Sequence, residues 1–185
     1  MTPVRRSNHI FLSLGSNIDP EFHLRLALQE LAKFGRVRAV SSVWESPALG
    51  RPDQPPYLNV VVHLEAGLSA AELSRRLIPE IERRLGRVRT ADKSGPRTID
   101  IDLLVFNEEL LEIEGHIIPS PEIQERPFVA LPLAEVAPAM LHPGGNRTFR
   151  EIASAFDQRG LKRRPDIRLT DGTLDAESGS EGRAR

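Results

Sequence analysis

The stretch Gly95-Pro96-Arg97-Thr98-Ile99-Asp100-Ile101-Asp102-Leu103-Leu104-Val105-Phe106 turns at a glycine and a proline and then enters an apolar run typical of a buried strand. Side chains on a strand alternate between its two faces, so Asp100 and Asp102 are predicted to share one face. The same alternation predicts a core on the opposite face, made of Ile99, Ile101, Leu103 and Val105, with Leu104 and Phe106 on the carboxylate face.

The two carboxylates of this strand need a cation nearby. Two like charges on a half-buried sheet repel each other and lose hydration, which raises their free energy unless positive charge compensates. Mg²⁺ is bound by a few carboxylates together with phosphate oxygens of a substrate. The pair therefore predicts a site for magnesium and phosphate, whereas the simpler alternative is two surface aspartates on an edge strand.

A basic segment precedes this strand. Between positions 82 and 97 only Glu82 and Asp92 are acidic, and the basic residues are Arg83, Arg84, Arg87, Arg89, Lys93 and Arg97. The planar fork of arginine matches phosphate oxygens, so several arginines beside two metal-type carboxylates predict a clamp on a polyphosphate. The alternative is a solvated basic loop that balances the acids around it.

Length and composition limit the classes of protein. A chain of 185 residues is long enough for one domain with a sizeable core, and a second full domain is not expected. The net charge of −1 gives no general signature of nucleic-acid binding, and the absence of cysteine excludes disulfides and fits a cytoplasmic protein. No apolar run approaches the ~20 residues that span a bilayer, and no signal peptide is expected, because no apolar region of signal-peptide length follows the charged start.

Hydrophobic patterns predict the order of the secondary structure. Strands are expected at 9–14, 37–46, 57–65 and 99–106, and helices at 20–34 and 69–85. Asp19 should cap the first helix, Ser69 and Glu72 form a capping box for the second, Pro79 should kink it and Gly86 should end it. A hairpin turn at 107–109 leads to short strands at 110–113 and near Ile117, and helical segments follow at 126–136, interrupted by Pro132, and after Thr148.

This order predicts an α+β fold. The expected architecture is a ferredoxin-like α/β sandwich with a mainly antiparallel central sheet, helices on both faces and an added hairpin. Residues 1–8 are expected to form a flexible N-terminus and residues 9–158 the domain. Residues 159–185 are expected to form a polar, disordered tail, because the segment is poor in apolar residues.

Five segments of the chain occur in the order found in one known family: Phe11–Asn17, Gln54–Asn59, Gly86–Arg89, Gly95–Asp102 and Arg126–Phe128. Over about residues 8–158 the chain resembles 6-hydroxymethyl-7,8-dihydropterin pyrophosphokinase, an enzyme of folate biosynthesis. The resemblance implies transfer of pyrophosphate from ATP to the hydroxymethyl group of the pterin, with release of AMP.

The resemblance also implies an ATP side of the site. Asp100 and Asp102 would bind two Mg²⁺ ions that bridge the triphosphate, and Arg87 and Arg97 would contact the phosphates. With these two aspartates, the two arginines make up the implied catalytic set. The implied ATP-binding residues are Glu82, Arg87, Arg89, Arg97, Leu103, Ser120 and Arg126, with Arg87 and Arg89 on a mobile loop that closes over the phosphates. For Glu82 alone, a salt bridge on a helix surface is the alternative.

A pterin side is implied in the same way. Tyr57 and Phe128 match aromatic residues that flank the flat ring, and Asn59 matches an amide that offers donors and an acceptor to the ring edge. The implied pterin-binding residues are Ser46, Pro47, Leu49, Gly50, Tyr57, Asn59 and Phe128. Without the resemblance, the two aromatics would be read as ordinary core residues.

The chain departs from the family pattern at two positions, Ser120 in place of a usual histidine and Ser94 in place of an aromatic residue found in some members. Three other functions stay open: a phosphotransferase that yields ADP, an RNA-binding module, and a relative that binds substrates without catalysis, which the Ser120 departure keeps open. The scarcity of aromatic residues opposes the RNA-binding module. The expected partners are ATP and the pterin, with no nucleic acid, no membrane and a monomeric, cytoplasmic protein.

Overall fold

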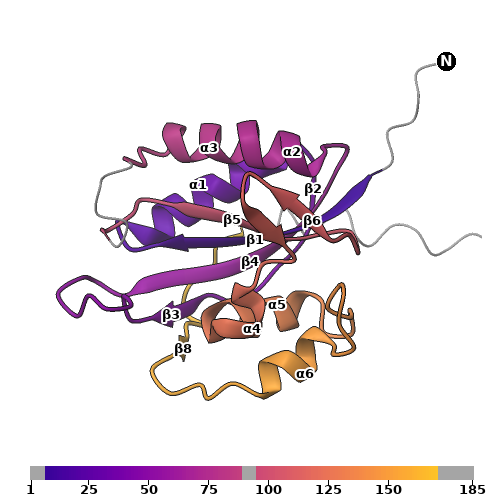
Figure 1. The fold of residues 1–185 in the computed structure, drawn as a ribbon. Helices are drawn as coiled ribbons and strands as arrows, with labels where there is room; N and C mark the ends of the chain where they lie inside the picture. Colours follow the sequence, from indigo (N-terminus) through magenta and orange to yellow (C-terminus); the bar gives the residue numbers. More distant parts are fainter. Residues whose placement is uncertain (1–6, 89–94, 171–185) are drawn as a thin grey trace, which may run out of the picture.

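A six-stranded antiparallel sheet forms the middle layer of the computed structural model, which describes residues 7–88 and 95–170. The strand order is β5-β1-β4-β3-β8, and β2 also pairs with β4 (Figure 1). The bounds are β1 (Asn8–Ser16), β2 (Arg36–Val40), β3 (Trp44–Ser46), β4 (Tyr57–Ala66), β5 (Asp100–Phe106) and β8 (Lys162–Arg163). Every pairing in this sheet is antiparallel, as the sequence pattern predicted for most of it.

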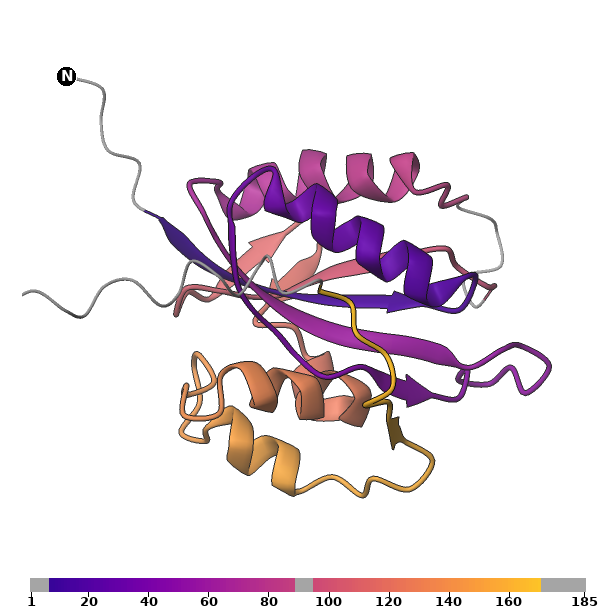
Figure 2. The same ribbon diagram turned by 180° about the vertical axis from the view of Figure 1, so that it is seen from behind.

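Helices cover both faces of the sheet, which confirms the mixed α/β architecture (Figures 1 and 2). One face carries α1 (Pro20–Ala32), α2 (Ala70–Glu72), a π-helical turn (Leu73–Leu77) and α3 (Ile78–Arg84). The other carries α4 (Glu122–Glu125), α5 (Pro127–Val136) and α6 (Phe149–Ser154). We call the two hydrophobic layers the upper core, which includes Leu12, Leu14, Leu28, Ile81 and Ile101, and the lower core, which includes Phe11, Val61, Leu104, Val129 and Phe149.

The alternation predicted for β5 holds at its start and is wrong at its end. Leu103 lies opposite Leu12 of β1, but Val105 lies opposite Phe11, so Leu104 is an extra residue in the ladder. Such a bulge moves the following side chains to the other face. As a result Val105 packs in the lower core and Phe106 in the upper core, the reverse of the prediction.

The predicted strand at 37–46 is two strands, because the chain leaves the ladder at 41–43. There the backbone N–H of Val61 donates to the Ser41 hydroxyl at 2.9 Å, so a side chain replaces a ladder partner. The predicted capping box is present at Ser69, and a second one, at Thr148, begins the helix that was expected there. Asp19 is the N-cap residue of α1 but makes no capping bond with its side chain, since its backbone is left-handed with φ of 42°.

Proline is accommodated within two helical segments. Ahead of Pro79, the π-helical turn pairs the N–H of Ile78 with the carbonyl of Leu73, so the altered hydrogen-bond spacing falls just before the proline. Helix α5 likewise continues through Pro132, which was expected to interrupt it.

Two predictions about chain organisation need correction. The short strand β6 (Leu111–Ile113) pairs with β7 (His116–Ile118) and not with β5. Glu114 and Gly115 both have positive φ and make the turn between them, so the hairpin turn lies there and not at 107–109. The predicted tail begins too early, because β8 joins the sheet and Ile167 and Leu169 are buried in the upper core. The ranges 1–6 and 171–185 lie outside the described residues.

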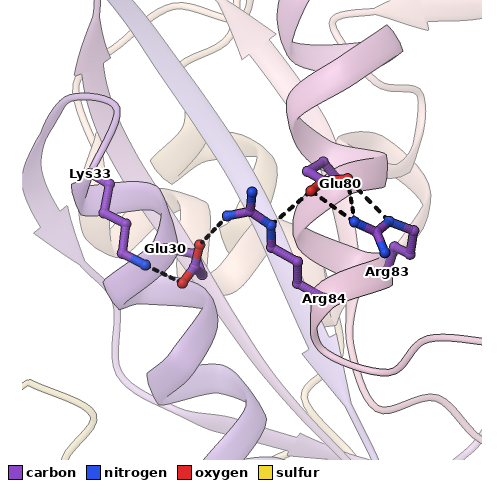
Figure 3. Close-up of polar contacts among 5 residues, drawn as sticks. All are labelled: Glu30, Lys33, Glu80, Arg83 and Arg84. Atoms are coloured by element: carbon purple, nitrogen blue, oxygen red, sulfur yellow. Dashed lines mark hydrogen bonds and ion pairs between the residues drawn. The ribbon is translucent and has the colours of Figure 1, made fainter.

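Ion pairs connect the two long helical segments over the upper core. Arg84 of α3 reaches Glu80 at 2.8 Å and Glu30 of α1 at 3.3 Å, and Lys33 and Arg83 extend the network (Figure 3). These contacts lie where α3 ends and the chain turns toward Arg87. Within the described residues, no helix combines the length and hydropathy of a membrane span.

Candidate active site

A cavity of about 300 Å³ opens on the lower face of the sheet, where β1, β4 and β5 meet the loop at 47–56 and the start of α4 and α5. It brings together most of the predicted site residues from both the ATP side and the pterin side. Its lining consists of Ser13, Gly15, Ser46, Pro47, Ala48, Leu49, Tyr57, Asn59, Arg97, Asp100, Asp102, Glu122, Arg126 and Phe128.

Strand register builds the floor of this cavity. Gly15 lies opposite Asn59 of β4 on one side and opposite Asp100 of β5 on the other, so the three residues form one row across the sheet. A Cβ atom on Gly15 would lie 3.3 Å from Asn59 Oδ1 and 3.8 Å from Tyr57 Cδ1. The missing side chain therefore leaves open the space between an amide and a carboxylate.

The end of α3 delivers the first predicted phosphate-binding arginine. Gly86 has φ of 77°, and the chain reverses there with bonds from the N–H of Gly86 to the Arg83 carbonyl (3.1 Å) and from the N–H of Arg87 to the Glu82 carbonyl (2.9 Å). This pattern is a Schellman motif, which needs a left-handed residue such as glycine. It places the Arg87 guanidinium against the carboxylates of both Glu82 and Asp100.

Asp100 is held by two arginines. Arg87 donates to its Oδ1 and Arg97 to its Oδ2. Glu82, 3% exposed, also accepts the backbone N–H of Ile101 at 3.0 Å, so it connects α3 to β5 behind Arg87. Burial lowers the pKa of Arg87, but the carboxylates of Asp100 and Glu82 outweigh that effect and hold the pKa above its ordinary value.

Asp102 differs from Asp100, because no other described residue forms a hydrogen bond or ion pair with its side chain. Its carboxylate opens to the cavity but is surrounded by the walls of the site, and this burial, reinforced by the charges of Asp100 and Glu122, raises its pKa to about 7. Burial likewise raises the pKa of Glu122. The floor of the cavity thus carries acidic groups whose ionisation is unfavourable until a cation arrives.

These residues fit a divalent metal ion. Asp100 and Asp102 project from the same face of β5 and offer hard oxygen ligands, and burial together with the neighbouring carboxylates raises the pKa of Asp102. Among residues 7–88 and 95–170, no group of three or more metal-ligating side chains is arranged to hold an ion. The remaining ligands would therefore come from phosphate oxygens and water, the usual arrangement for Mg²⁺.

The pterin side of the cavity has polar and aromatic walls. Both donors of the Asn59 amide are used within the protein, on the Trp44 carbonyl (3.1 Å) and the Ser46 hydroxyl (3.0 Å), which leaves its oxygen for a ligand. Asn59 was predicted to offer donors as well, and the structure corrects this. The half-buried rings of Tyr57 and Phe128 line the cavity, and the Tyr57 hydroxyl donates to the Gly95 carbonyl at 3.4 Å.

Several predicted residues lie elsewhere. The Leu103 side chain is buried in the upper core, and Gly50 is exposed with φ of 69° outside the cavity lining. The Ser120 hydroxyl accepts the N–H of Glu122 at 3.3 Å at the start of α4, so it serves the helix terminus. Arg89 and Ser94 lie outside the described residues.

The structure adds four cavity residues that the sequence did not single out: Ser13, Gly15, Ala48 and Glu122. Ser13 and Gly15 belong to a motif of the resemblance and alternate with apolar residues, which was a usable signal. Glu122 follows Ser120 by two residues and carried no such signal, because only the folding of α4 over the sheet brings it to the carboxylates.

Comparison with known proteins agrees with this geometry. The sequence profile of the 7,8-dihydro-6-hydroxymethylpterin-pyrophosphokinase (HPPK) family matches residues 11–138. The chain belongs to this family. It is therefore a pyrophosphokinase, a diphosphotransferase that uses ATP and transfers pyrophosphate onto hydroxymethyldihydropterin in folate biosynthesis. Kinase activity with ATP generally implies a divalent metal ion.

The relatives named 2-amino-4-hydroxy-6-hydroxymethyldihydropteridine pyrophosphokinase cover most of the chain. The Bacillus subtilis protein is 42% identical over 160 residues, which span 84% of this chain and 90% of the relative. The Synechocystis protein is 40% identical over 149 residues, spanning 79% of this chain and 75% of the relative. The Pseudomonas aeruginosa protein is 36% identical over 159 residues, spanning 84% of this chain and 96% of the relative.

Solved structures share the fold at low identity. A crystal structure of Plasmodium falciparum HPPK-DHPS with pteroate matches with a TM-score of 0.65 and 14% identity, over 88% of this chain and 47% of that one. The chain thus spans about half the length of that protein.

Proposed function

We propose that the cavity on the lower face of the sheet is where 6-hydroxymethyl-7,8-dihydropterin accepts pyrophosphate from ATP. The observation that carries this proposal is the row of Asn59, Gly15 and Asp100 across three strands. One end of the row offers an amide oxygen between aromatic walls, and the other offers a carboxylate held by two arginines. A flat polar ring and a polyphosphate can therefore lie side by side, with the acceptor next to the donor.

The ATP side would hold Mg²⁺ on Asp100 and Asp102, two ions with the nucleotide in place. When bound, Mg²⁺ supplies charge neutralisation of the phosphates and of the departing AMP. Arg87 and Arg97 already lie against Asp100 and would donate to phosphate oxygens from the same positions. Arg126 adds a further cation to the cavity lining, and Arg89 belongs to the proposal through the resemblance.

The protein contributes mainly by position. Arg87 is held by Glu82, and Glu82 is itself held by the N–H of Ile101, so a phosphate-binding cation is connected to the strand that carries the carboxylates. Such fixed charges stabilise a transition state in which negative charge spreads over phosphate oxygens. Glu82 serves here as a positioning residue, since it lies behind Arg87 and outside the cavity lining.

The pterin side of the cavity would bind a ring edge that carries hydrogen-bond donors. An aminopyrimidinone presents N–H groups, and the free Asn59 oxygen can accept one of them. Tyr57 and Phe128 would stack on the two ring faces, which adds about 0.5–1.5 kcal/mol per aromatic pair beyond burial. Ser46, Pro47 and Leu49 would close the ring edge from the loop that follows β3.

We also propose that the sheet and its helices form a ferredoxin-like fold. The order β5-β1-β4-β2 supports a ferredoxin-like core, to which the β6–β7 hairpin and β8 are additions. The domain would comprise the residues from β1 to about 170. A monomer in the cytoplasm that binds no nucleic acid agrees with a near-neutral chain and a site built within one copy.

Phosphorus NMR tests the reaction directly. Purified protein with ATP, Mg²⁺ and 6-hydroxymethyl-7,8-dihydropterin should yield AMP and a pterin diphosphate. Formation of ADP would identify another phosphotransferase. Unchanged ATP together with measured pterin binding would identify a relative without catalysis.

A further inference from the structure

A buried asparagine connects the two sides of the proposed site. Asn17 follows β1 directly and is 4% exposed. Its side-chain oxygen accepts the backbone N–H of Arg97 at 2.8 Å, and its own backbone N–H donates to the Arg97 carbonyl at 3.1 Å. Its side-chain nitrogen donates to Gln54 Oε1 at 3.2 Å and to the Pro55 carbonyl at 3.3 Å.

The oxygen of Asn17 serves the ATP side. Arg97 is held through both its N–H and its carbonyl, while its side chain donates to Asp100. The Ser16 hydroxyl adds a long contact to the same carbonyl at 3.5 Å. Fixing this backbone fixes the origin of a guanidinium that must meet a phosphate, because a displacement of about 1 Å can cost about a hundredfold in rate.

The nitrogen of Asn17 serves the pterin side. Gln54 and Pro55 stand directly before β4, which begins with Tyr57. The N–H of Gln54 also donates to the Arg51 carbonyl, and the N–H of Arg51 to the Ala48 carbonyl. The contact with Asn17 therefore supports a loop that supplies the cavity with Pro47, Ala48 and Leu49.

We propose that Asn17 is a positioning residue for both substrates, its oxygen aligning Arg97 for the triphosphate and its nitrogen holding the pterin loop. The inference rests on the proposed function of the cavity. It also explains why the segment 11–17 and the segment 54–59 occur together with the Gly95–Asp102 segment, since all three meet at this one amide. The role acts through other residues, because Asn17 does not line the cavity.

Asn8 provides a matched control at the other end of β1. Its side-chain nitrogen donates to the Leu68 carbonyl at 2.9 Å and its oxygen accepts from Asn107 at 3.0 Å, so it also joins two segments with one amide. Asn8 is absent from the cavity lining. A purely structural role for Asn17 predicts that Asn8→Ala and Asn17→Ala lower the melting temperature and leave the kinetic constants alike.

Three variants separate the two atoms of the Asn17 amide. Asn17→Ala should lower kcat about tenfold and raise the KM for the pterin about tenfold, the factor expected for one hydrogen bond at each side. Gln54→Leu should raise the KM for the pterin, with a smaller effect on kcat. Asn17→Asp combined with Gln54→Leu retains the acceptor for Arg97, so kcat should recover relative to Asn17→Ala while the KM for the pterin stays high.

The proposal is overturned if Asn17→Ala matches Asn8→Ala in kcat and KM at a temperature where both are folded. It is also overturned if the double variant loses as much kcat as Asn17→Ala. Arg97→Ala, measured in parallel, distinguishes a wrong role for Asn17 from a wrong assignment of the active site. Unaltered turnover in Arg97→Ala would show that the cavity is not the active site, whatever the result for Asn17.

Discussion

The lower face of the β1–β4 pair carries polar side chains at both ends, and the two ends behave differently. At one end His9 and His63 lie 3.0 Å apart between ring nitrogens, and Glu65 pairs with Arg38 at 3.6 Å. His63 also stacks on Phe11 with ring centroids 4.5 Å apart. These groups satisfy one another.

At the other end, Asn59 keeps an amide oxygen free and Gly15 leaves space. Asp102, on the adjacent strand β5, faces the cavity, and the pKa of its carboxyl is raised. Polar and apolar residues alternate at both ends of β4, through His63 and Glu65 at one end and through Tyr57 and Asn59 at the other. An unsatisfied group beside a cavity therefore marks a site, whereas polar character on a strand does not.

Removing a carboxylate from the cavity should reduce turnover more than any other change described below. Asp102→Ala should lower the rate of AMP formation by about 10²–10³-fold or more, because a cation ligand at the transferring phosphates is lost. Glu65→Ala, at the other end of the same face, should leave kcat within about twofold of wild type, since charge there acts only on neighbours. Initial rates measure both, and circular dichroism verifies folding. Near-normal turnover in Asp102→Ala would contradict the metal assignment.

The affinity for Mg²⁺·ATP should depend on pH. Mg²⁺ binds the ionised carboxylate, so protonation of Asp102 competes with the metal below its pKa of about 7. The affinity for Mg²⁺·ATP should be about tenfold weaker at pH 6 than at pH 8. Calorimetry in buffers of different ionisation enthalpy measures the affinity and the protons released.

Asp102→Asn supplies the control for stability. A folded-state pKa above the unfolded one stabilises the protein at low pH, and this contribution is lost as pH rises through about 7. Without metal, Asp102→Asn should therefore melt higher than wild type at pH 8, and by clearly less at pH 5, where most of this contribution remains. Equal melting differences at both pH values would remove Asp102 as the titrating group.

The third prediction separates ligand contact from core packing. Tyr57→Ala should raise the KM for the pterin about tenfold and the KM for ATP much less, because stacking on the ring is lost. Steady-state kinetics with each substrate varied in turn measures this. An equal change in both constants would indicate that Tyr57 supports the fold instead.

A substitution at the histidine end should have the weakest effect, and it should act on stability. Burial, reinforced by His9, lowers the pKa of His63. A lowered pKa contributes stability above the ordinary value of 6.5 that is lost as pH falls below it. His63→Leu should therefore reduce the loss of melting temperature between pH 8 and pH 5.5 by about 2 °C. Turnover at pH 8 should stay near that of wild type, and a large loss of kcat would connect this end to the site.

Local signals predicted much of the fold. The capping box at Ser69, the turn at Gly86 and the shared face of Asp100 and Asp102 depend on residues near one another in sequence, so the pattern was sufficient. The register shift at Leu104 could not be predicted from such a local pattern, because it depends on how β5 aligns with β1. The apolar alternation of Ile167 and Leu169 was a usable sign of burial within a polar segment.

The site was predicted in part for the same reason. Motif residues at strand ends lie together in one cavity, whereas Glu122 reaches it only through the packing of α4. Glu82 was expected to contact ATP, and its place behind Arg87 emerges only when the end of α3 is seen against β5.

Leu104, the extra residue in β5, marks a position where the strand can lose one residue. The carbonyl of Leu104 accepts the N–H of Ser120 at 2.8 Å, which anchors the chain just before α4. Deleting Leu104 would leave the aspartates and the following Val105 and Phe106 on their present faces, because the ladder loses only its unpaired residue. It would free the segment that carries Glu122. A one-residue deletion in a buried strand would thus loosen one wall of the cavity and spare its floor.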